Sequence, residues 1–311
     1  MQKKSQEIIS EIKKVIVGKD EIVKRVFMAI LSKGHVLLDD IPGVGKTTLA
    51  LSFSLVLGLD FQRLQCTPDT TPSDIVGYSF YRKGASELEY KPGAVMCNLL
   101  LADEINRTSA KTQSALLEAM QEGNVTVDGA THPLPEPFMV IATQNPFGSA
   151  GTQLLPQSQL DRFALCLGMG YPDFDSHVQI LKDRDREKPL KNVNKVLSIA
   201  DLIQMQHEVD SVLVQDSIFE YITRLAEATR ENPDIALGLS PRGALSTLKT
   251  AKAGAYIMGR DYLVPGDIAD IFSYAAAHRI IISPKAKIAG TTTAEIVEKI
   301  INTTKTPAFQ I

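Results

Sequence analysis

Pro42-Gly43-Val44-Gly45-Lys46-Thr47-Thr48 decides the fold of this 311-residue chain. An apolar run at 35–38 precedes it and a helical pattern over 47–58 follows it, so it joins a predicted strand to a predicted helix. In that context the glycines let backbone N–H groups face phosphate oxygens, and the helix start adds positive potential. Lys46 is expected to reach the terminal phosphates, and Thr47 to give its hydroxyl to a magnesium ion. The stretch therefore predicts a P-loop whose residues 42–48 bind a nucleotide.

One position departs from the general P-loop pattern G-x-x-x-x-G-K-[ST]. That pattern places a glycine at position 40, where this chain has Asp40. Aspartate tolerates unusual backbone angles better than most residues do. We therefore expect Asp40 to adopt the loop conformation, with its carboxylate pointing away from the phosphates.

Strands and helices alternate after the P-loop. Apolar strands are predicted at 99–102, 138–142 and 164–167, with a helix over about 109–121. Such alternation is typical of a parallel sheet covered by helices. Two further segments, about 78–90 and about 124–134, alternate around turn residues and are predicted to be inserted hairpins.

The pattern changes to long helical periodicity after Tyr171-Pro172. We therefore predict an α/β fold with two domains. Residues 1–172 form an αβα nucleotide-binding core, a parallel sheet sandwiched by helices that carries both hairpins. Residues 173–311 form a linker and a smaller all-α lid domain.

Two carboxylates end the strand at 99–102. Asp103 and Glu104 project from the edge of a parallel sheet where such sheets bind ligands. Asp103 is placed to hold magnesium, and Glu104 to polarise the attacking water. Asn145 follows the strand predicted to neighbour this one, where it can orient that water against the terminal phosphate.

The composition limits the partners and the compartment. A net charge of −3 and a pI near 6.0 disfavour nucleic acid as the main partner. No apolar run approaches the roughly 18 residues of a membrane span, so stable membrane insertion is not expected. The cysteines show no disulfide or zinc spacing, and the chain start has no signal-like apolar stretch. A cytoplasmic protein fits these features best.

Several segments together resemble the MoxR ATPases, which are AAA+ proteins of the helix-2-insert group. The resemblance extends over nearly the whole chain, and its most specific segments are Asp103-Glu-Ile-Asn-Arg107, Gln113-Ser-Ala-Leu-Leu-Glu-Ala-Met120, Thr143-Gln-Asn-Pro146 and Leu160-Asp-Arg-Phe163. It implies a ring, usually a hexamer, that binds ATP and Mg²⁺ between neighbouring subunits. By the same analogy, the adenine is expected near Val17 and Gly18.

The resemblance also assigns two arginines. It implies that Arg162 is an arginine finger for the adjacent subunit; the alternative is that Arg162 pairs with Asp161 or Glu104 of its own subunit. It implies that Arg242 is the second sensor. Because Arg242 lies in the first turn of a predicted helix, where a cation is disfavoured, a bound phosphate would offset that cost.

Two further positions leave questions open. Gly243 replaces an alanine that is common in the family, which predicts a looser helix start. Arg107 is either a further sensor or part of a surface salt bridge.

The resemblance favours ATP hydrolysis coupled to chaperone-like remodelling of a protein complex, alongside a partner with a von Willebrand factor A domain. A metal-chelatase motor subunit shares this architecture and stays open as an alternative. A nucleic-acid motor should have a basic hairpin before the first sensor, but residues 123–137 contain no lysine or arginine. A scaffold that binds ATP without hydrolysis is disfavoured by the complete set of site residues: Lys46, Asp103, Glu104, Asn145, Arg162 and Arg242.

Overall fold

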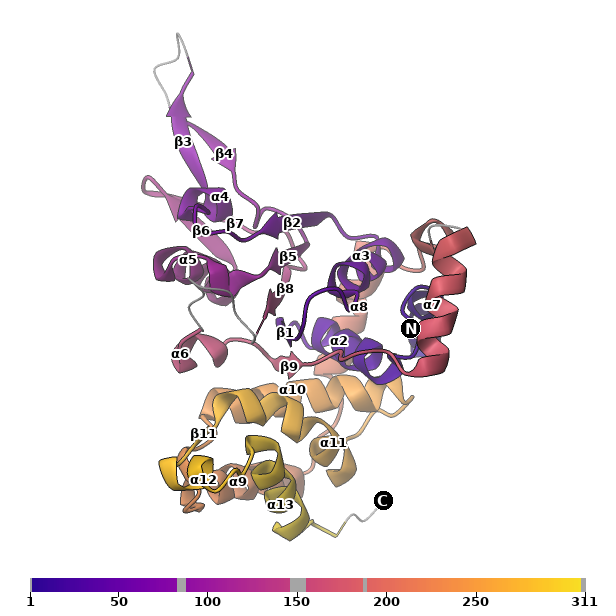
Figure 1. The fold of residues 1–311 in the computed structure, drawn as a ribbon, viewed down its shortest axis with the longest axis vertical. Coiled ribbons are helices and arrows are strands. Elements are labelled where there is room, and N and C mark those ends of the chain that lie inside the picture. Colours follow the sequence, from indigo (N-terminus) through magenta and orange to yellow (C-terminus); the bar gives the residue numbers. More distant parts are fainter. Residues whose placement is uncertain (1, 83–87, 146–154, 187–188, 309–311) are drawn as a thin grey trace.

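A parallel sheet forms the centre of the computed structural model, which describes residues 2–82, 88–145, 155–186 and 189–308 (Figure 1). Its strand order is β2-β5-β8-β1-β9, and every neighbouring pair is parallel. The strands are β1 (Val36–Asp39), β2 (Phe61–Gln65), β5 (Leu99–Asp103), β8 (Met139–Gln144) and β9 (Leu165–Leu167). The predicted P-loop α/β fold is therefore confirmed. The sequence analysis missed β2, an edge strand in which no residue is fully buried.

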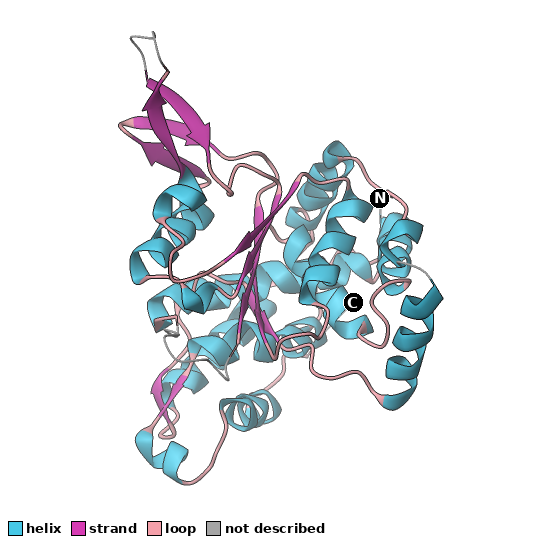
Figure 2. Ribbon diagram, turned by 45° about the horizontal axis from the view of Figure 1, so that its top comes forward, coloured by secondary structure: helices cyan, strands magenta, loops and turns pink. Residues whose placement is uncertain are grey.

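Helices cover both faces of this sheet (Figure 2). Alternate strand residues enter two separate hydrophobic clusters, as the two-residue period of a strand requires. Leu99 and Leu101 pack with α1 (Gln2–Lys13), α2 (Asp20–Leu31) and α3 (Lys46–Leu57). Leu100 and Ala102 pack with α5 (Ala110–Glu122) on the other face. Burial on both faces explains why the central strands are continuous apolar runs.

Both predicted hairpins are present. β3 (Gly77–Tyr81) pairs with β4 (Leu88–Pro92), and their tip lies outside the described residues. A short helix, α4 (Pro72–Val76), leads into this hairpin, which projects away from the sheet (Figure 1). β6 (Asn124–Val127) pairs with β7 (Ala130–Pro133) through the predicted Asp128-Gly129 turn, where both residues have positive φ.

The carboxyl-terminal region is a helical lid, as predicted. It contains α9 (Asp216–Glu231), α10 (Pro241–Ile257), α11 (Pro265–Ala276), α12 (Pro284–Ile288) and α13 (Thr293–Thr303). The structure adds a short antiparallel pair that the sequence analysis did not predict, β10 (Ile235–Leu237) with β11 (Ile281–Ile282).

α6 (Gln157–Leu160) lies between β8 and β9, whereas α7 (Phe174–Arg186) and α8 (Ile199–Asp210) connect the sheet to the lid. α8 packs on the amino-terminal part of the chain, because the buried Gln206 amide donates to the carbonyl of Ile30 at 2.9 Å. The division at residue 172 stays a prediction. Short 3-10 turns at Ile105–Arg107, Pro189–Asn192 and Ala277–Arg279 complete the described elements, and none of the described helices is long and apolar enough to cross a membrane.

Candidate active site

The P-loop has the conformation that phosphate binding requires. Gly43 and Gly45 have φ of 84° and 97°, values that favour glycine, and Gly45 immediately precedes α3. A Cβ added at Gly43 would meet no heavy atom within 4 Å. No side chain caps the described start of α3, which leaves its first N–H groups available to phosphate oxygens. The loop therefore encloses an open cradle of the kind that a polyphosphate fills.

The Lys46 side chain crosses this loop. Its Nζ donates to the backbone carbonyl of Asp40 at 2.6 Å, and the residue is buried. Burial lowers the pKa of the Lys46 ammonium, while the nearby carboxylates of Asp40 and Asp103 oppose that shift. Lys46 is thus a cation held between the loop and the acidic strand, and Thr47 follows it in the first turn of α3.

Asp40 ties the loop to a distant segment. Its Oδ1 accepts the N–H of Ile41 at 2.7 Å, and its Oδ2 accepts the N–H of Gly170 at 2.5 Å. The carboxylate therefore points away from the cradle, as expected. It fastens the start of the P-loop to the segment between β9 and α7.

Removing this carboxylate is expected to destabilise the protein. Asp40→Ala leaves two N–H groups without their acceptor, at a cost of about 1–3 kcal/mol in the free energy of unfolding. Asp40→Gly, which restores the general P-loop glycine, is expected to lose the same hydrogen bonds. Denaturant unfolding measures the effect, with the exposed Asp69→Ala as the control. Equal stability of the Asp40 and Asp69 variants would contradict the structural role of Asp40.

Asp103 is the last residue of β5 and Glu104 follows it; β8 lies between β5 and β1, the strand that leads into the P-loop. Asp103 accepts the Thr143 hydroxyl at 2.7 Å on Oδ1 and the Arg63 guanidinium at 2.8 Å on Oδ2. Glu104 has a left-handed backbone with φ of 59°, and its N–H donates to Thr143 Oγ1 at 2.8 Å. Its carboxylate accepts from Arg107 at 2.9 Å. Arg107 thus forms a salt bridge in this structure, and its role as a further sensor stays a prediction.

Asn145 lies next to the acidic pair. It follows β8, which pairs directly with β5 as the sequence predicted. The Asn106 amide donates to the Asn145 backbone carbonyl at 3.2 Å, which fixes the loop after β8 against the turn after Glu104. The structure thus brings together the P-loop, Asp103, Glu104 and Asn145 at the carboxyl-terminal edge of the sheet.

A cavity of about 300 Å³ adjoins the P-loop. Val17 and Thr48 line it, together with Pro42, Gly43, Val44 and Gly45, and so do residues of α7 that the sequence analysis did not single out, including His177 and Ile180. Its position beside the phosphate cradle suits a nucleoside. α7 therefore forms one wall of this cavity, and no sequence motif had indicated it.

Gly18 lies at the contact between the α1–α2 turn and α7. Its φ is 72°, and an added Cβ would lie 2.1 Å from Ser176 Oγ and 2.8 Å from Ser176 Cβ. Only glycine allows the start of α7 to approach this closely. Gly18 thus shapes the cavity through α7, and its contact with adenine stays a prediction.

Arg162 and Arg242 meet at a different place. Both donate to Oε1 of Gln121, Arg162 from Nε at 3.2 Å and Arg242 from Nη2 at 3.3 Å. Neither arginine lines the cavity beside the P-loop. Arg162 forms no ion pair with either of the partners in its own subunit that were considered for it. Asp161 pairs with Arg279 instead, and Glu104 pairs with Arg107.

The Gln121 end of α5 lies at the opposite edge of the sheet from the P-loop. His35 precedes β1, accepts the Val140 N–H on Nδ1 and donates from Nε2 to the Met120 carbonyl at 3.0 Å. β1 then runs to the P-loop, and a strand of that length spans on the order of 13 Å. The two arginines are thus remote from the phosphate cradle of their own subunit.

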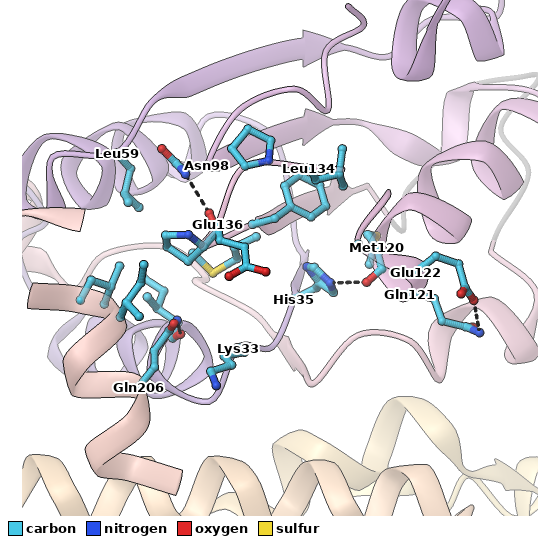
Figure 3. A pocket seen from close by; sticks show the side chains of 18 of the residues that line it. Lys33, His35, Leu59, Asn98, Met120, Gln121, Glu122, Leu134, Glu136 and Gln206 are labelled. Carbon is cyan, nitrogen blue, oxygen red and sulfur yellow. Dashed lines mark hydrogen bonds between the residues drawn. The ribbon is translucent and has the colours of Figure 1, made fainter. Parts of the chain in front are cut away.

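A second cavity of about 360 Å³ lies beside His35 at this edge (Figure 3). Lys33, Asn98, Glu136 and Gln206 are among its lining residues. Burial lowers the pKa of His35 to about 4, so its ring is neutral at physiological pH. None of the described residues of the P-loop or of the acidic pair lines this cavity, and we therefore assign nucleotide binding to the cavity beside the P-loop.

Comparison with known proteins agrees with this geometry. Residues 35–165 match the model of the ATPase family associated with various cellular activities (AAA), and residues 227–300 match the AAA lid domain. The chain is 38% identical to Chaperone MoxR1 of Mycobacterium tuberculosis over 96% of its own length and 81% of that protein. The chain belongs to the MoxR-type AAA+ ATPases.

Two other relatives support the assignment. Protein YeaC of Bacillus subtilis is 46% identical, over 96% of this chain and 93% of its own. A crystal structure from Cytophaga hutchinsonii, of a protein assigned as an ATPase, superposes with a TM-score of 0.92 at 36% identity, covering 99% of this chain and 96% of that one. Membership of the AAA+ ATPases carries with it nucleotide binding and the ATPase fold.

The AAA+ site of this chain contains polar residues that sequence reasoning did not assign. The Thr143 hydroxyl donates to Asp103 and accepts from the Glu104 N–H. Arg63 pairs with Asp103. Gln121 accepts hydrogen bonds from both arginines. Thr143 could have been found, because it sits in the motif that ends at Asn145. Arg63 and Gln121 carry no local signal, since their partners are distant in the chain.

Proposed function

We propose that this chain hydrolyses ATP with Mg²⁺ at the interfaces of a ring, and that the cycle remodels a protein complex. The observation that supports the interface is the convergence of Arg162 and Arg242 on Gln121, remote from the P-loop of the same subunit. In a ring, the face that carries these arginines meets the nucleotide of the next subunit. A guanidinium there neutralises charge that develops on the transferred phosphoryl group.

The proposed chemistry uses the residues around the acidic strand. Lys46 and the P-loop N–H groups bind the phosphates, and Thr47 with Asp103 holds Mg²⁺, which when bound neutralises phosphate charge. No group of three or more acidic, histidine or cysteine ligands occurs among the described residues, and a magnesium ion shared with substrate phosphates needs none. Glu104 polarises the attacking water and Asn145 orients it.

Two ion pairs must open for this reaction. Arg63 contacts the carboxylate of Asp103, which would hold Mg²⁺, and Arg107 contacts the Glu104 carboxylate. The arginine side chains are at least 40% exposed, whereas the Asp103 and Glu104 side chains are 13% and 27% exposed, so solvent screens these pairs in part. Binding of Mg²⁺ and ATP can therefore displace them.

The remodelling part of the proposal rests on the family and on the inserted hairpins. Chaperone MoxR1 is named a chaperone. The β3–β4 hairpin exposes Tyr78, Phe80 and Tyr81, and aromatic side chains at such exposure suit contact with another protein. A von Willebrand factor A domain protein is the partner that we propose, in the cytoplasm, with a hexamer as the assembly.

Mixing two inactive variants tests the interface. Lys46→Ala lacks a working P-loop but keeps its arginines, and Arg162→Ala has the reverse defect. Co-assembled rings are expected to regain part of the ATPase activity, because some interfaces then combine an intact P-loop with an intact Arg162. Lys46→Ala with Arg242→Ala should behave alike.

The control is a mixture of Arg162→Ala and Arg242→Ala, which should stay inactive because no interface has both arginines. Persistent inactivity of verified mixed Lys46→Ala and Arg162→Ala rings would overturn the assignment of Arg162 to the neighbouring site.

A further inference from the structure

Arg279, from the short turn after α11, is nearly fully buried, with 3% of its surface exposed. Its Nε donates to Asp161 Oδ1 at 2.8 Å, and its Nη2 donates to the Asp161 carbonyl at 3.0 Å and the Phe163 carbonyl at 2.7 Å. Its Nη1 donates to the Ala164 carbonyl at 3.3 Å and to the Ala275 carbonyl. A lid guanidinium thus holds the chain on both sides of Arg162.

The Asp161 carboxylate also binds the start of the helix that carries Arg242. Asp161 Oδ1 also accepts the Ser240 hydroxyl at 2.9 Å, and Ser240 caps α10 by accepting the Gly243 N–H at 3.0 Å. Arg242 lies in the first turn of that helix. Asp161 therefore joins the segment that carries Arg162 to the helix start that carries Arg242.

Gly243 makes room for this arrangement. A Cβ at Gly243 would lie 2.8 Å from Arg279 Cδ, and 2.3 Å and 3.0 Å from two carbons of Leu239. Carbon atoms do not approach this closely, so any larger residue must displace Arg279 or Leu239. The glycine beside Arg242 is explained by the Leu239 and Arg279 side chains packed against it.

We propose that Arg279 is a positioning residue that locks the lid to residues 161–164, so that Arg162 and Arg242 are presented to the neighbouring subunit as one rigid pair. This inference rests on the proposed assignment of Arg162 to the neighbouring site. Its consequence is that movement of one lid shifts the arginines that complete the next nucleotide site. In this structure, the Gln121 side chain accepts a hydrogen bond from each of the two arginines.

The test uses Arg279→Lys, which keeps the positive charge but loses the planar fork that reaches several carbonyls at once. We expect kcat to fall by about a hundredfold, the scale expected from a misplacement of about 1 Å, while ATP affinity stays the same. Arg260→Lys is the matched control, because the Arg260 guanidinium also binds a carboxylate and a backbone carbonyl of the lid, those of Asp267 and Tyr262, but no residue of 161–164. Its activity should be that of the unmodified chain.

Mixed rings distinguish a positioning role from general loss of structure. Arg279→Lys with Lys46→Ala should regain activity, because the Arg279→Lys subunit keeps an intact P-loop and receives good arginines from its neighbour. Arg279→Lys with Arg162→Ala should stay inactive, because both subunits then present defective arginines. Regain in the second mixture, or full activity of Arg279→Lys alone, would overturn the inference.

The outcome also separates this inference from the proposed function. If Lys46→Ala and Arg162→Ala complement each other but Lys46→Ala and Arg279→Lys do not, Arg279 has no positioning role and the interface assignment stands. If neither mixture regains activity, the interface assignment itself is wrong. If Arg279→Lys fails to assemble, Gly243→Ala is a second variant, because the added Cβ would displace Leu239 or Arg279 while Arg279 itself is retained. Its ATPase activity is measured in the same mixtures.

Discussion

Arg162→Ala is expected to lower the kcat of ATP hydrolysis by about a thousandfold or more, with ATP affinity nearly unchanged. The large effect follows from removing a cation that stabilises the transferred phosphoryl group. The affinity stays nearly unchanged because the guanidinium acts mainly on charge that develops in the transition state, whereas Lys46 and the P-loop N–H groups bind the nucleotide. Steady-state kinetics measures kcat, and equilibrium binding of a fluorescent nucleotide measures the affinity.

Two controls make this result specific. Arg162→Lys keeps the charge but not the fork geometry, and it should recover only part of the rate. Arg224→Ala removes a lid arginine that pairs with Glu220 on the same helix, α9. It should leave kcat unchanged, because neither residue belongs to the proposed site. A variant Arg162→Ala that hydrolyses ATP at the normal rate, in verified rings, would remove Arg162 from the reaction.

The nucleotide-binding half of the site was accessible from sequence because its signals are local. The P-loop, the Asp103-Glu104 pair and Asn145 each follow a recognisable strand, and parallel strands bring their carboxyl ends to one edge. Strand alternation then predicted that β8 lies beside β5, which the structure confirms. Adjacent strands were enough to place these residues together.

The other half depends on contacts between distant parts of the chain. Gln121 sits at the polar end of α5, and its two arginine donors are 41 and 121 residues away. Arg279 binds Asp161 across 118 residues. Neither residue has a neighbouring motif that distinguishes it from an ordinary surface or core residue. Only the packing of the folded chain reveals these contacts.

Besides the β10–β11 pair, the sequence analysis missed β2 and α7, for related reasons. β2 is an edge strand with polar side chains, so it lacks the apolar run that identified the central strands. α7 buries none of its described side chains completely, and its polar sequence resembles a linker. Its position is fixed by the close approach to Gly18, which only the backbone geometry shows.

Glu104→Gln is expected to lower kcat by about a hundredfold to ten-thousandfold, while ATP remains bound. The substitution removes the base that polarises water but preserves the size of the side chain. It also preserves the left-handed backbone at φ 59°, which the N–H donation to Thr143 holds in place, and a carbonyl that can still accept from Arg107. The site should therefore stay folded and loaded.

This variant also tests the remodelling proposal. Rings that hold ATP without hydrolysing it should retain a bound client, so a pull-down with Glu104→Gln in ATP should recover protein that the same variant does not recover in ADP. Glu118→Gln, an exposed change on the adjacent helix α5, is the control and should show normal turnover. Unchanged turnover of Glu104→Gln would remove Glu104 from its role. Steeply salt-dependent recovery of nucleic acid instead of protein would favour the motor alternative.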